Sequence, residues 1–323
     1  MGDEPNPILN AANAIAEEAD ADVFLYNSAI GRPFDDEVIS SCCSHRVHKN
    51  VIVLLVTEGG DADAAYRIAR SFQDHYERFI CIVPGYCKSA GTLILTGAHE
   101  LAMTDFGELG PLDVQMAKKD ELGERESGLV VTSALEALRR SAFSSFEHFF
   151  LTMQRKSRFL ITFKTAAEYA AKLTTGLFSP IYGQIDPRLI AESSRAQAIG
   201  LQYGTRLGLV GQNIDDDNLY RLISAYPTHG FVIDRSEAQT LFKNVRKPTE
   251  TETSLIKRLG KLATEPLQES DMIRRFLSGD VKNDDQDANS GRNTGTGDDA
   301  PTGTPGESVE RQDGDAGVGT PTP

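Results

Sequence analysis

Residues 51–60 read Val-Ile-Val-Leu-Leu-Val-Thr-Glu-Gly-Gly, and residues 79–91 read Phe-Ile-Cys-Ile-Val-Pro-Gly-Tyr-Cys-Lys-Ser-Ala-Gly. Each stretch is a short apolar, β-branched run that stops at a turn marked by glycine, and a helical pattern follows each turn. Two strand–turn–helix units in series place their turns at the same edge of a parallel sheet. Ligands and chemistry gather at that edge in open α/β folds, so the two turns are where we expect the function to lie.

Composition separates a folded part from a polar tail. The chain has 323 residues, of which 40% are hydrophobic, and a formal net charge of −14. Residues 280–323 carry −7 of that charge and are rich in Gly, Thr, Asn and Pro, so we expect this tail to be disordered. The remaining part is mildly acidic, which argues against non-specific binding of nucleic acid.

The cysteines and the hydropathy pattern exclude several classes of protein. Cys42, Cys43, Cys81 and Cys87 do not have the spacing of a zinc site, and we expect reduced, mostly buried thiols. No apolar run approaches the roughly 18 residues of a membrane span, and none has the form of a signal peptide. The sequence therefore predicts a cytoplasmic protein without a membrane span, a metal or a cofactor.

Strands alternate with helices in the first part of the chain, and helices dominate beyond residue 115. The expected strands are residues 23–26, 51–56, 79–83, 101–103 and 229–234. The expected helices are residues 14–19, 35–43, 64–72, 92–98, 133–153, 165–173, 190–207 and 215–225, a segment reaching residue 242, and one or two weakly packed helices within 254–277. We also expect a proline-bounded connection at residues 180–187.

Ser89 is the candidate nucleophile. It lies at a strand-to-helix junction, where its hydroxyl is expected to be exposed beside the free amides of the helix start. The surrounding sequence matches half of the Gly-x-Ser-x-Gly elbow, because Cys87 occupies the first glycine position while Gly91 fills the second. The structural alternative for this serine is a helix N-cap, a position that serine favours.

The two turns together offer an oxyanion hole. A tetrahedral intermediate needs amide donors close to the nucleophile. Gly59 and Gly60 allow a turn with positive φ and let a ligand approach the bare backbone. We expect the amides of Gly60 and Ala90 to hold the oxyanion, with Gly59 assisting the turn.

The general base is left open by the residues alone. Among six histidines His229 is the one candidate, since His99 closes the helix that the serine opens. Lysine is the other option, because burial lowers its pKa and frees the amine to act as a base. Lys88 is expected to point to the other side of the turn, whereas Lys118 and Lys119 follow a segment that should pass along the site.

Four motifs together resemble the Clp-protease/crotonase superfamily, and within it the serine dehydrogenase proteinase group, relatives of signal peptide peptidase A. The motifs are Thr-Glu-Gly-Gly at 57–60, Lys-Ser-Ala-Gly-Thr at 88–92, Glu-Leu-Gly-Pro-Leu-Asp at 108–113 and Tyr-Pro-Thr-His-Gly-Phe-Val-Ile-Asp at 226–234. The similarity covers about residues 21–245. It implies an α/β spiral of β-β-α units, homo-oligomers such as trimer-based rings, and ATP-independent hydrolysis of peptides or unfolded proteins.

The resemblance also implies roles for individual residues. Ser89 corresponds to the family nucleophile, and Gly60 and Ala90 match the residues that supply oxyanion amides. The Clp subunit uses a Ser-His-Asp triad, but the position of its histidine reads Leu-Gly-Pro here. Signal peptide peptidases use a Ser-Lys dyad instead, which favours Lys119 as the base and Lys118 as the alternative. They usually carry a membrane anchor, which this sequence does not show.

The predicted organisation has four parts. They are an N-terminal segment at 1–20, a Clp/crotonase-like serine peptidase domain at 21–246, a helical extension at 247–279 and a disordered acidic tail at 280–323.

Two other functions compete with the peptidase. One is a crotonase-like enzyme that binds an acyl-coenzyme A thioester in the same amide pair, with Glu108 or Asp113 as a carboxylate base. The other is an inactive oligomeric scaffold whose acidic tail recruits a partner.

Overall fold

A computed structural model describes residues 6–112, 115–117, 125–267 and 271–278, and for residues 115–117 and 125–133 it describes the backbone alone. All of these residues belong to one unit, Met1–Val281.

A six-stranded sheet forms the centre of this unit, in the order β10-β1-β2-β3-β5-β9. Its strands are β1 (Ala21–Asn27), β2 (Asn50–Val56), β3 (Arg78–Val83), β5 (Glu100–Met103), β9 (Val245–Arg246) and β10 (Ile273–Phe276). All neighbouring pairs are parallel except β1 and β10. The inner strands are buried on both faces, which explains why their sequences are continuous apolar runs rather than alternating ones. The predicted α/β class with a parallel sheet and added helices is confirmed.

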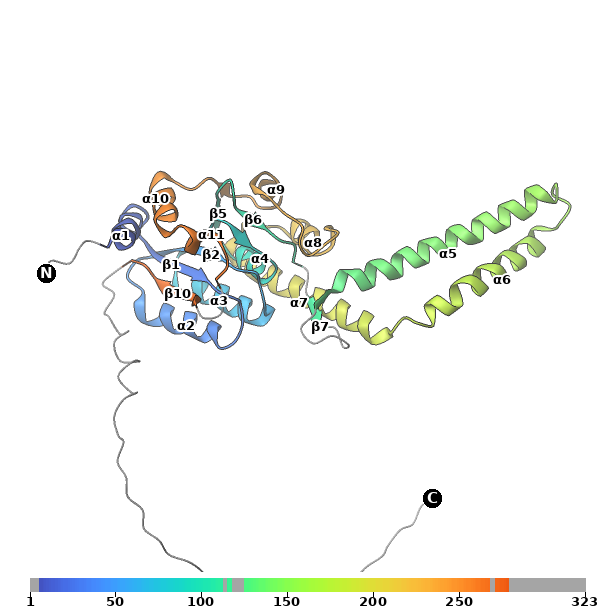
Figure 1. The fold of residues 1–323 in the computed structure, drawn as a ribbon, viewed down its shortest axis with the longest axis horizontal. Helices are drawn as coiled ribbons and strands as arrows, with labels where there is room; N and C mark the ends of the chain where they lie inside the picture. Colours follow the sequence, from blue (N-terminus) through green and yellow to red (C-terminus); the bar gives the residue numbers. More distant parts are fainter. Residues whose placement is uncertain (1–5, 113–114, 118–124, 268–270, 279–323) are drawn as a thin grey trace, which may run out of the picture. The chain divides into compact units, whose positions relative to one another are not determined.

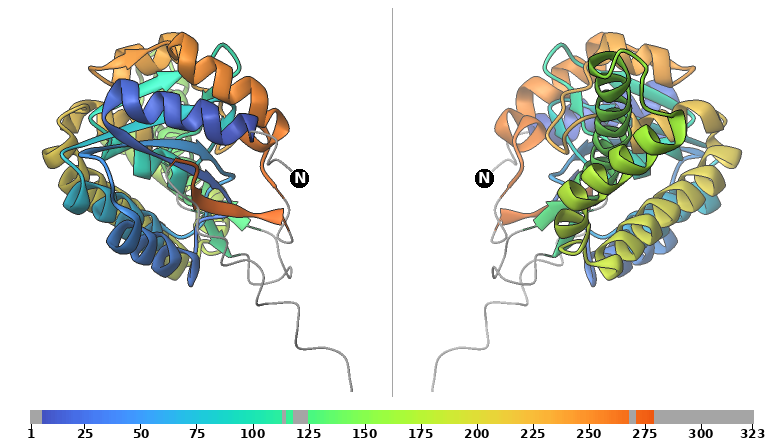
Figure 2. Two further views of the ribbon diagram at one scale, coloured as in Figure 1. Left: turned by 90° about the vertical axis from the view of Figure 1, so that its left-hand side faces the viewer. Right: turned by 90° about the vertical axis from the view of Figure 1, so that its right-hand side faces the viewer.

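Helices cover both faces of the sheet. One face carries α2 (Phe34–His45), α3 (Ala62–His75), α4 (Ala90–Thr96) and α7 (Pro187–Gly211), and the other carries α1 (Pro7–Ala19), α10 (Glu250–Leu259) and α11 (Lys261–Thr264). Figures 1 and 2 show α1 and α10 on one side of the sheet and α2 and α3 on the other. Because side chains alternate along a strand, Phe24 packs in the core under α2 and α3. Val23 and Leu25 pack in the core on the opposite face, under α1 and α10.

The later part of the chain is mainly helical, as predicted. It contains α5 (Gly128–Lys156), α6 (Phe163–Tyr182), α7, α8 (Asp216–Ser224) and α9 (Arg235–Leu241). Helices α5 and α6 pack against each other, while α7 packs on α3 and α4. Two short strand pairs complete the fold, β4 (Tyr86–Cys87) with β6 (Glu108–Leu109) and β7 (Gln115–Ala117) with β8 (Arg125–Ser127).

Two predicted elements are wrong. The expected connection at 180–187 begins inside a helix, because Pro180 belongs to α6 and the helix continues only to Tyr182 before Gly183 caps it. Pro180 lacks the N–H that would bond to the Gly176 carbonyl, and the helix ends within one turn of it. The expected strand at 229–234 is reduced to one antiparallel bridge between Ile233 and Leu109, and Asp234 already caps the next helix.

The segment 254–277 differs most from its prediction. It contains two helices, as expected, but they are firmly packed, since Leu255 is fully buried. It also contains β10, which pairs antiparallel with β1 and closes that edge of the main sheet. Its apolar residues are too few for a strand signal, and the edge of β1 is what selects the extended conformation.

The contact of β10 with the sheet can be tested at Phe276. Its ring lies against that of Phe24, with the centroids 4.9 Å apart in an edge-on arrangement. We expect Phe276→Ala to lower the free energy of unfolding by about 2 kcal/mol, since the ring is partly buried. Chemical denaturation measures this change, with Val47→Ala as the control because that side chain is 72% exposed. Equal stability of the two variants would contradict the pairing.

Candidate functional site

The two glycine-marked turns lie side by side at one end of the sheet. The Thr57 amide donates to the Tyr86 carbonyl at 2.9 Å, and the Lys88 amide donates to the Thr57 carbonyl at 3.0 Å. A Cβ atom on Gly59 would stand 2.8 Å from the Ser89 Cβ and 2.9 Å from the Lys88 carbonyl oxygen. The first turn therefore packs so closely on the second that a side chain at position 59 does not fit. The expectation that both turns share one edge is confirmed.

Both glycines of the first turn are required by the backbone itself. Gly59 has φ 103° and Gly60 has φ 145°, values that other residues rarely adopt. A Cβ on Gly60 would overlap the carbonyl oxygen of Ile30. Ile30 follows β1 and holds the turn from its far side, since its amide donates to the Gly59 carbonyl at 2.9 Å and its carbonyl accepts from the Asp61 amide at 2.8 Å.

The amides of the two turns differ in what they bind. The Gly59 amide donates to the Thr57 hydroxyl at 3.0 Å, so it stabilises the turn. Ala90 is the first residue of α4. The first amides of a helix have no carbonyl partner within that helix, and the Ala90 amide is one of them. Gly60 is exposed, whereas Ala90 is buried.

Ser89 has a strained backbone at the start of α4. Its φ of 52° and ψ of −114° are unusual for a residue with a side chain. The hydroxyl makes no capping hydrogen bond to α4, so the N-cap interpretation of this serine is not realised. Strain of this kind persists where the surroundings fix the conformation, and here the Thr57–Cys87 bridge and the α4 helix do so.

Lys88 points away from its neighbour, as predicted, and binds the other loops of the site. Its buried amine donates to the Leu109 carbonyl at 3.2 Å and to the Phe231 carbonyl at 3.4 Å. It also lies 3.3 Å from a carboxylate oxygen of Glu108. The Lys88 amine therefore connects the serine turn to β6 and to the segment before α9.

The two turns line a cavity of about 610 Å³. Gly59, Gly60, Ser89 and Ala90 all lie in its wall, and so does His229, which comes from the turn after α8. The structure thus brings the candidate histidine into the same cavity as the candidate nucleophile. The other residues of the wall are Ala29, Ile30, Gly31, Glu58, Asp61, Ala62, Tyr86, Leu93, Leu112 and Gly200.

Several of these wall residues were missed in the sequence. Ile30 follows β1 and Gly200 belongs to α7, so both are far along the chain from the two turns. Neither carries a chemical group that would have singled it out. The parallel order of β1 and β2 was the usable signal, because it brings the residues after β1 to the first turn.

The sequence also offers Lys118, Lys119 and Asp113 as bases, but it disfavours His99. Lys118, Lys119 and Asp113 lie outside the residues that the structure describes. His99 is described, and its Nδ1 accepts a hydrogen bond from the Phe79 amide at 3.1 Å, with burial lowering its pKa. It does not line the cavity of Ser89.

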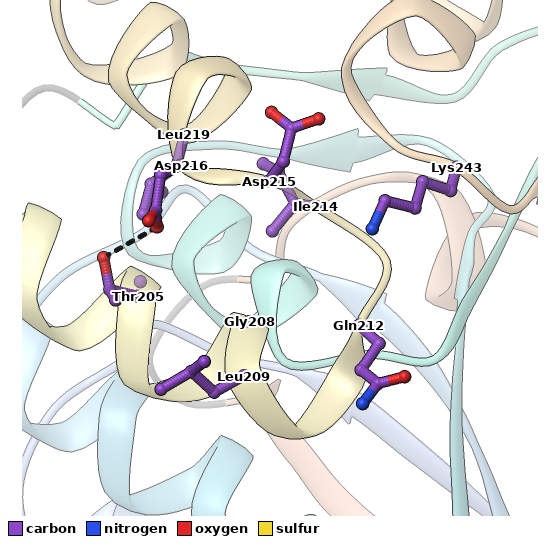
Figure 3. A pocket seen from close by; sticks show the side chains of 10 residues that line it. Thr205, Gly208, Leu209, Gln212, Ile214, Asp215, Asp216, Leu219 and Lys243 are labelled. Carbon is purple, nitrogen blue, oxygen red and sulfur yellow. Dashed lines mark hydrogen bonds between the residues drawn. The ribbon is translucent and has the colours of Figure 1, made fainter.

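A second cavity, of about 350 Å³, lies between the end of α7 and the start of α8 (Figure 3). Figure 3 shows the Lys243 amine pointing toward this space, and the Thr205 hydroxyl donates to Asp216 at 3.3 Å. No serine or cysteine is among the described residues that line it. We therefore place the candidate site in the larger cavity.

Neither a metal-binding cluster nor a membrane-spanning helix is found in the described part of the chain. It contains no group of three or more His, Cys, Asp or Glu side chains that could hold a metal ion. None of its helices has both the length and the apolar character needed to cross a membrane.

Comparison with known proteins agrees with this geometry. The family model described as ClpP-like SDH-type serine proteinase matches residues 35–122, which contain both turns. The family resemblance seen in the sequence is confirmed. The matched ClpP-like region includes Ser89, Ala90 and the two glycines, but ends before α5.

Two curated relatives come from Methanocaldococcus jannaschii. Uncharacterized protein MJ1495 is 25% identical over 184 residues, which are 54% of this chain and 56% of the relative. Uncharacterized protein MJ0137 is 31% identical over 83 residues, which are 26% of this chain and 29% of the relative. The chain thus spans about half the length of the first relative and less than a third of the second.

Two solved structures are similar at low identity. One is a serine-to-alanine mutant of the 1510-N membrane-bound stomatin-specific protease, with TM-score 0.40 and 16% identity over 74% of this chain and 83% of that one. The other is a lysine-to-alanine mutant of that protease in complex with a substrate peptide, with TM-score 0.41 and 15% identity over 80% of this chain and 89% of that one.

The thiol beside the candidate nucleophile can be tested for reactivity. Cys87 is fully buried and burial raises its pKa, so its thiol stays protonated at pH 8 and is a poor nucleophile. Burial likewise raises the pKa of Cys42 to about 11, whereas Cys43 is exposed. We expect iodoacetamide at pH 8 to label Cys43 in the native protein and all four thiols only after denaturation, as read by mass spectrometry. The Cys43→Ser variant is the control, because it lacks the exposed thiol. Rapid labelling of Cys87 in the native protein would contradict the burial of that thiol.

Proposed function

We propose that this protein is a serine peptidase that hydrolyses peptide bonds without ATP, with Ser89 as the nucleophile. The observation that carries the proposal is the close packing of the diglycine turn against the serine turn at one cavity. The matching family of serine proteinases covers both turns. A nucleophile and bare backbone amides at one cavity are the parts that acyl transfer requires.

In the proposed reaction the Ser89 hydroxyl oxygen attacks the carbonyl carbon of the scissile peptide. The base takes the hydroxyl proton, and the carbonyl oxygen becomes negative in the tetrahedral intermediate. The amides of Gly60 and Ala90 donate to that oxygen, while the Gly59 amide, engaged with Thr57, keeps the turn in place. The base then gives its proton to the leaving amine, and water hydrolyses the acyl-enzyme by the same steps in reverse order.

We propose a lysine as the base, Lys119 first and Lys118 second, in a Ser-Lys dyad. A lysine serves this purpose when burial keeps its amine neutral near pH 7. Lys88 is unsuited to the task because its amine is already engaged by two carbonyls and by Glu108. His229 is the competing base, since it lies in the wall of the Ser89 cavity.

The proposed substrates are peptides or unfolded proteins, and the proposed assembly is a homo-oligomer built on trimers in the cytoplasm. An extended peptide fits an open cavity of about 610 Å³ better than a folded protein does. The crotonase alternative is weaker, because Glu108 faces Lys88 and is not part of the cavity wall.

The nucleophile assignment is tested by Ser89→Ala. We expect hydrolysis of an unstructured protein such as casein to fall by at least ~10³-fold, because the acyl-enzyme cannot form. A fluorophosphonate probe should label the parent protein at Ser89 and leave the variant unlabelled. Ser44→Ala serves as the matched control, since Ser44 is exposed and distant in sequence. Undiminished hydrolysis by Ser89→Ala would show that another group attacks the substrate.

The base is tested by three separate variants, Lys119→Met, Lys118→Met and His229→Gln. We expect Lys119→Met to lower kcat by about 10²- to 10⁴-fold with little change in KM, because general-base help is lost only in the transition state. Loss of kcat in His229→Gln with both lysine variants active would assign the base to the histidine instead. Thermal denaturation of each variant shows whether the fold is kept.

A further inference from the structure

The turn between α5 and α6 has a defined backbone conformation. The Phe159 amide donates to the Gln154 carbonyl at 2.9 Å, and the Leu160 amide donates to the Ser157 carbonyl at 3.0 Å. Arg158 and Phe159 both have positive φ, 51° and 63°. An aromatic residue rarely adopts this conformation, so the turn holds Phe159 in place at a cost in backbone strain.

Three large apolar side chains at this turn face water. Phe159 is 69% exposed, Leu160 is 86% exposed and Phe163 is 69% exposed. Burial of side chains of this size stabilises a folded protein, and this turn forgoes that stabilisation. A single exposed leucine is ordinary, but three such side chains within five positions mark a surface that meets an apolar partner.

The same turn is strongly basic in an acidic protein. Arg155, Lys156, Arg158 and Lys164 are all exposed, and residues 148–167 contain no Asp or Glu. None of the four makes an ion pair with another residue that the structure describes. The whole chain carries −14, so this local charge of +4 opposes the sign of the rest.

We propose that the α5–α6 turn, residues 154–164, docks this protein on the surface of a membrane that contains anionic phospholipids. Phe159, Leu160 and Phe163 enter the boundary between headgroups and acyl chains, and the four cations bind lipid phosphates. The docking is peripheral. It does not depend on the peptidase activity proposed above, since no residue of the Ser89 cavity belongs to the turn.

Charge favours a lipid surface over a second copy of the chain. Two identical turns meeting about a two-fold axis would place four cations opposite four cations, which is unfavourable. An anionic bilayer repels the acidic remainder of the chain, so the turn shown at the end of the α5–α6 pair in Figure 1 is the part that it attracts.

The chain has no tryptophan, so one introduced at the turn reports on its surroundings alone. We expect the fluorescence of Leu160→Trp to shift to the blue, and to be quenched by brominated lipids, when phosphatidylcholine vesicles with 30% phosphatidylglycerol are added. Leu209→Trp is the matched control, because Leu209 is 71% exposed on α7. Its emission should not change.

Vesicle co-sedimentation of the full chain separates the two contributions. Replacing the four cations by glutamine should weaken binding by on the order of 100-fold or more at low salt, since each basic residue near an anionic surface contributes about fivefold. The triple change Phe159→Ser, Leu160→Ser and Phe163→Ser should abolish the binding that persists at 0.5 M salt. Lys257→Gln with Arg258→Gln is the charge control, because both residues are exposed on α10.

Three results would overturn the proposal. They are absence of binding to anionic vesicles at low salt, equal binding to pure phosphatidylcholine vesicles, and a blue shift of Leu160→Trp that depends on protein concentration rather than on lipid. The last result, with a larger mass in light scattering, would assign the turn to self-association. Circular dichroism confirms that each variant is folded, which is expected because every altered side chain is exposed.

Discussion

The site depends on how closely the backbones of two turns approach each other. The bridge between Thr57 and Cys87 extends the parallel pairing of the sheet beyond the ends of β2 and β3. It brings Gly59 so near to Ser89 that a Cβ atom would not fit between them. Because positive φ and missing side chains are both required, glycine is the only residue that allows this contact. Ser89 and the backbone of Gly59, Gly60 and Ala90 share a cavity as a result of that one constraint.

Lys88 links the serine turn to other segments of the same region. A buried cation needs partners, and this one takes them from the carbonyls of Leu109 and Phe231 and from Glu108. These partners belong to segments that are distant in the sequence, so a single ammonium group fixes the walls around the serine. Lys88 therefore has a structural role, since it connects the serine turn to both of these segments.

Much of this could be predicted from the sequence, because the strong signals were local. The apolar runs of β2 and β3, the glycines after them and the helix starts give the sheet and both turns. The features that could not be predicted depend on contacts between residues that are far apart in the sequence. Phe276 reads as part of a helical tail, but the open edge of β1 selects a strand there. Residues 229–234 read as a strand, but the chain pairs only at Ile233 because the cap of α9 begins at Asp234. Ile30 and Gly200 reach the cavity through the topology alone.

A crystal structure of the protein treated with a peptidyl boronate measures the central geometry directly. If the two turns form an oxyanion hole, boron is bonded to the Ser89 oxygen, and a boronate oxygen lies about 2.7–3.1 Å from the amide nitrogens of both Gly60 and Ala90. A boronate bonded elsewhere, or bonded to Ser89 with that oxygen turned away from both amides, would contradict the proposed chemistry.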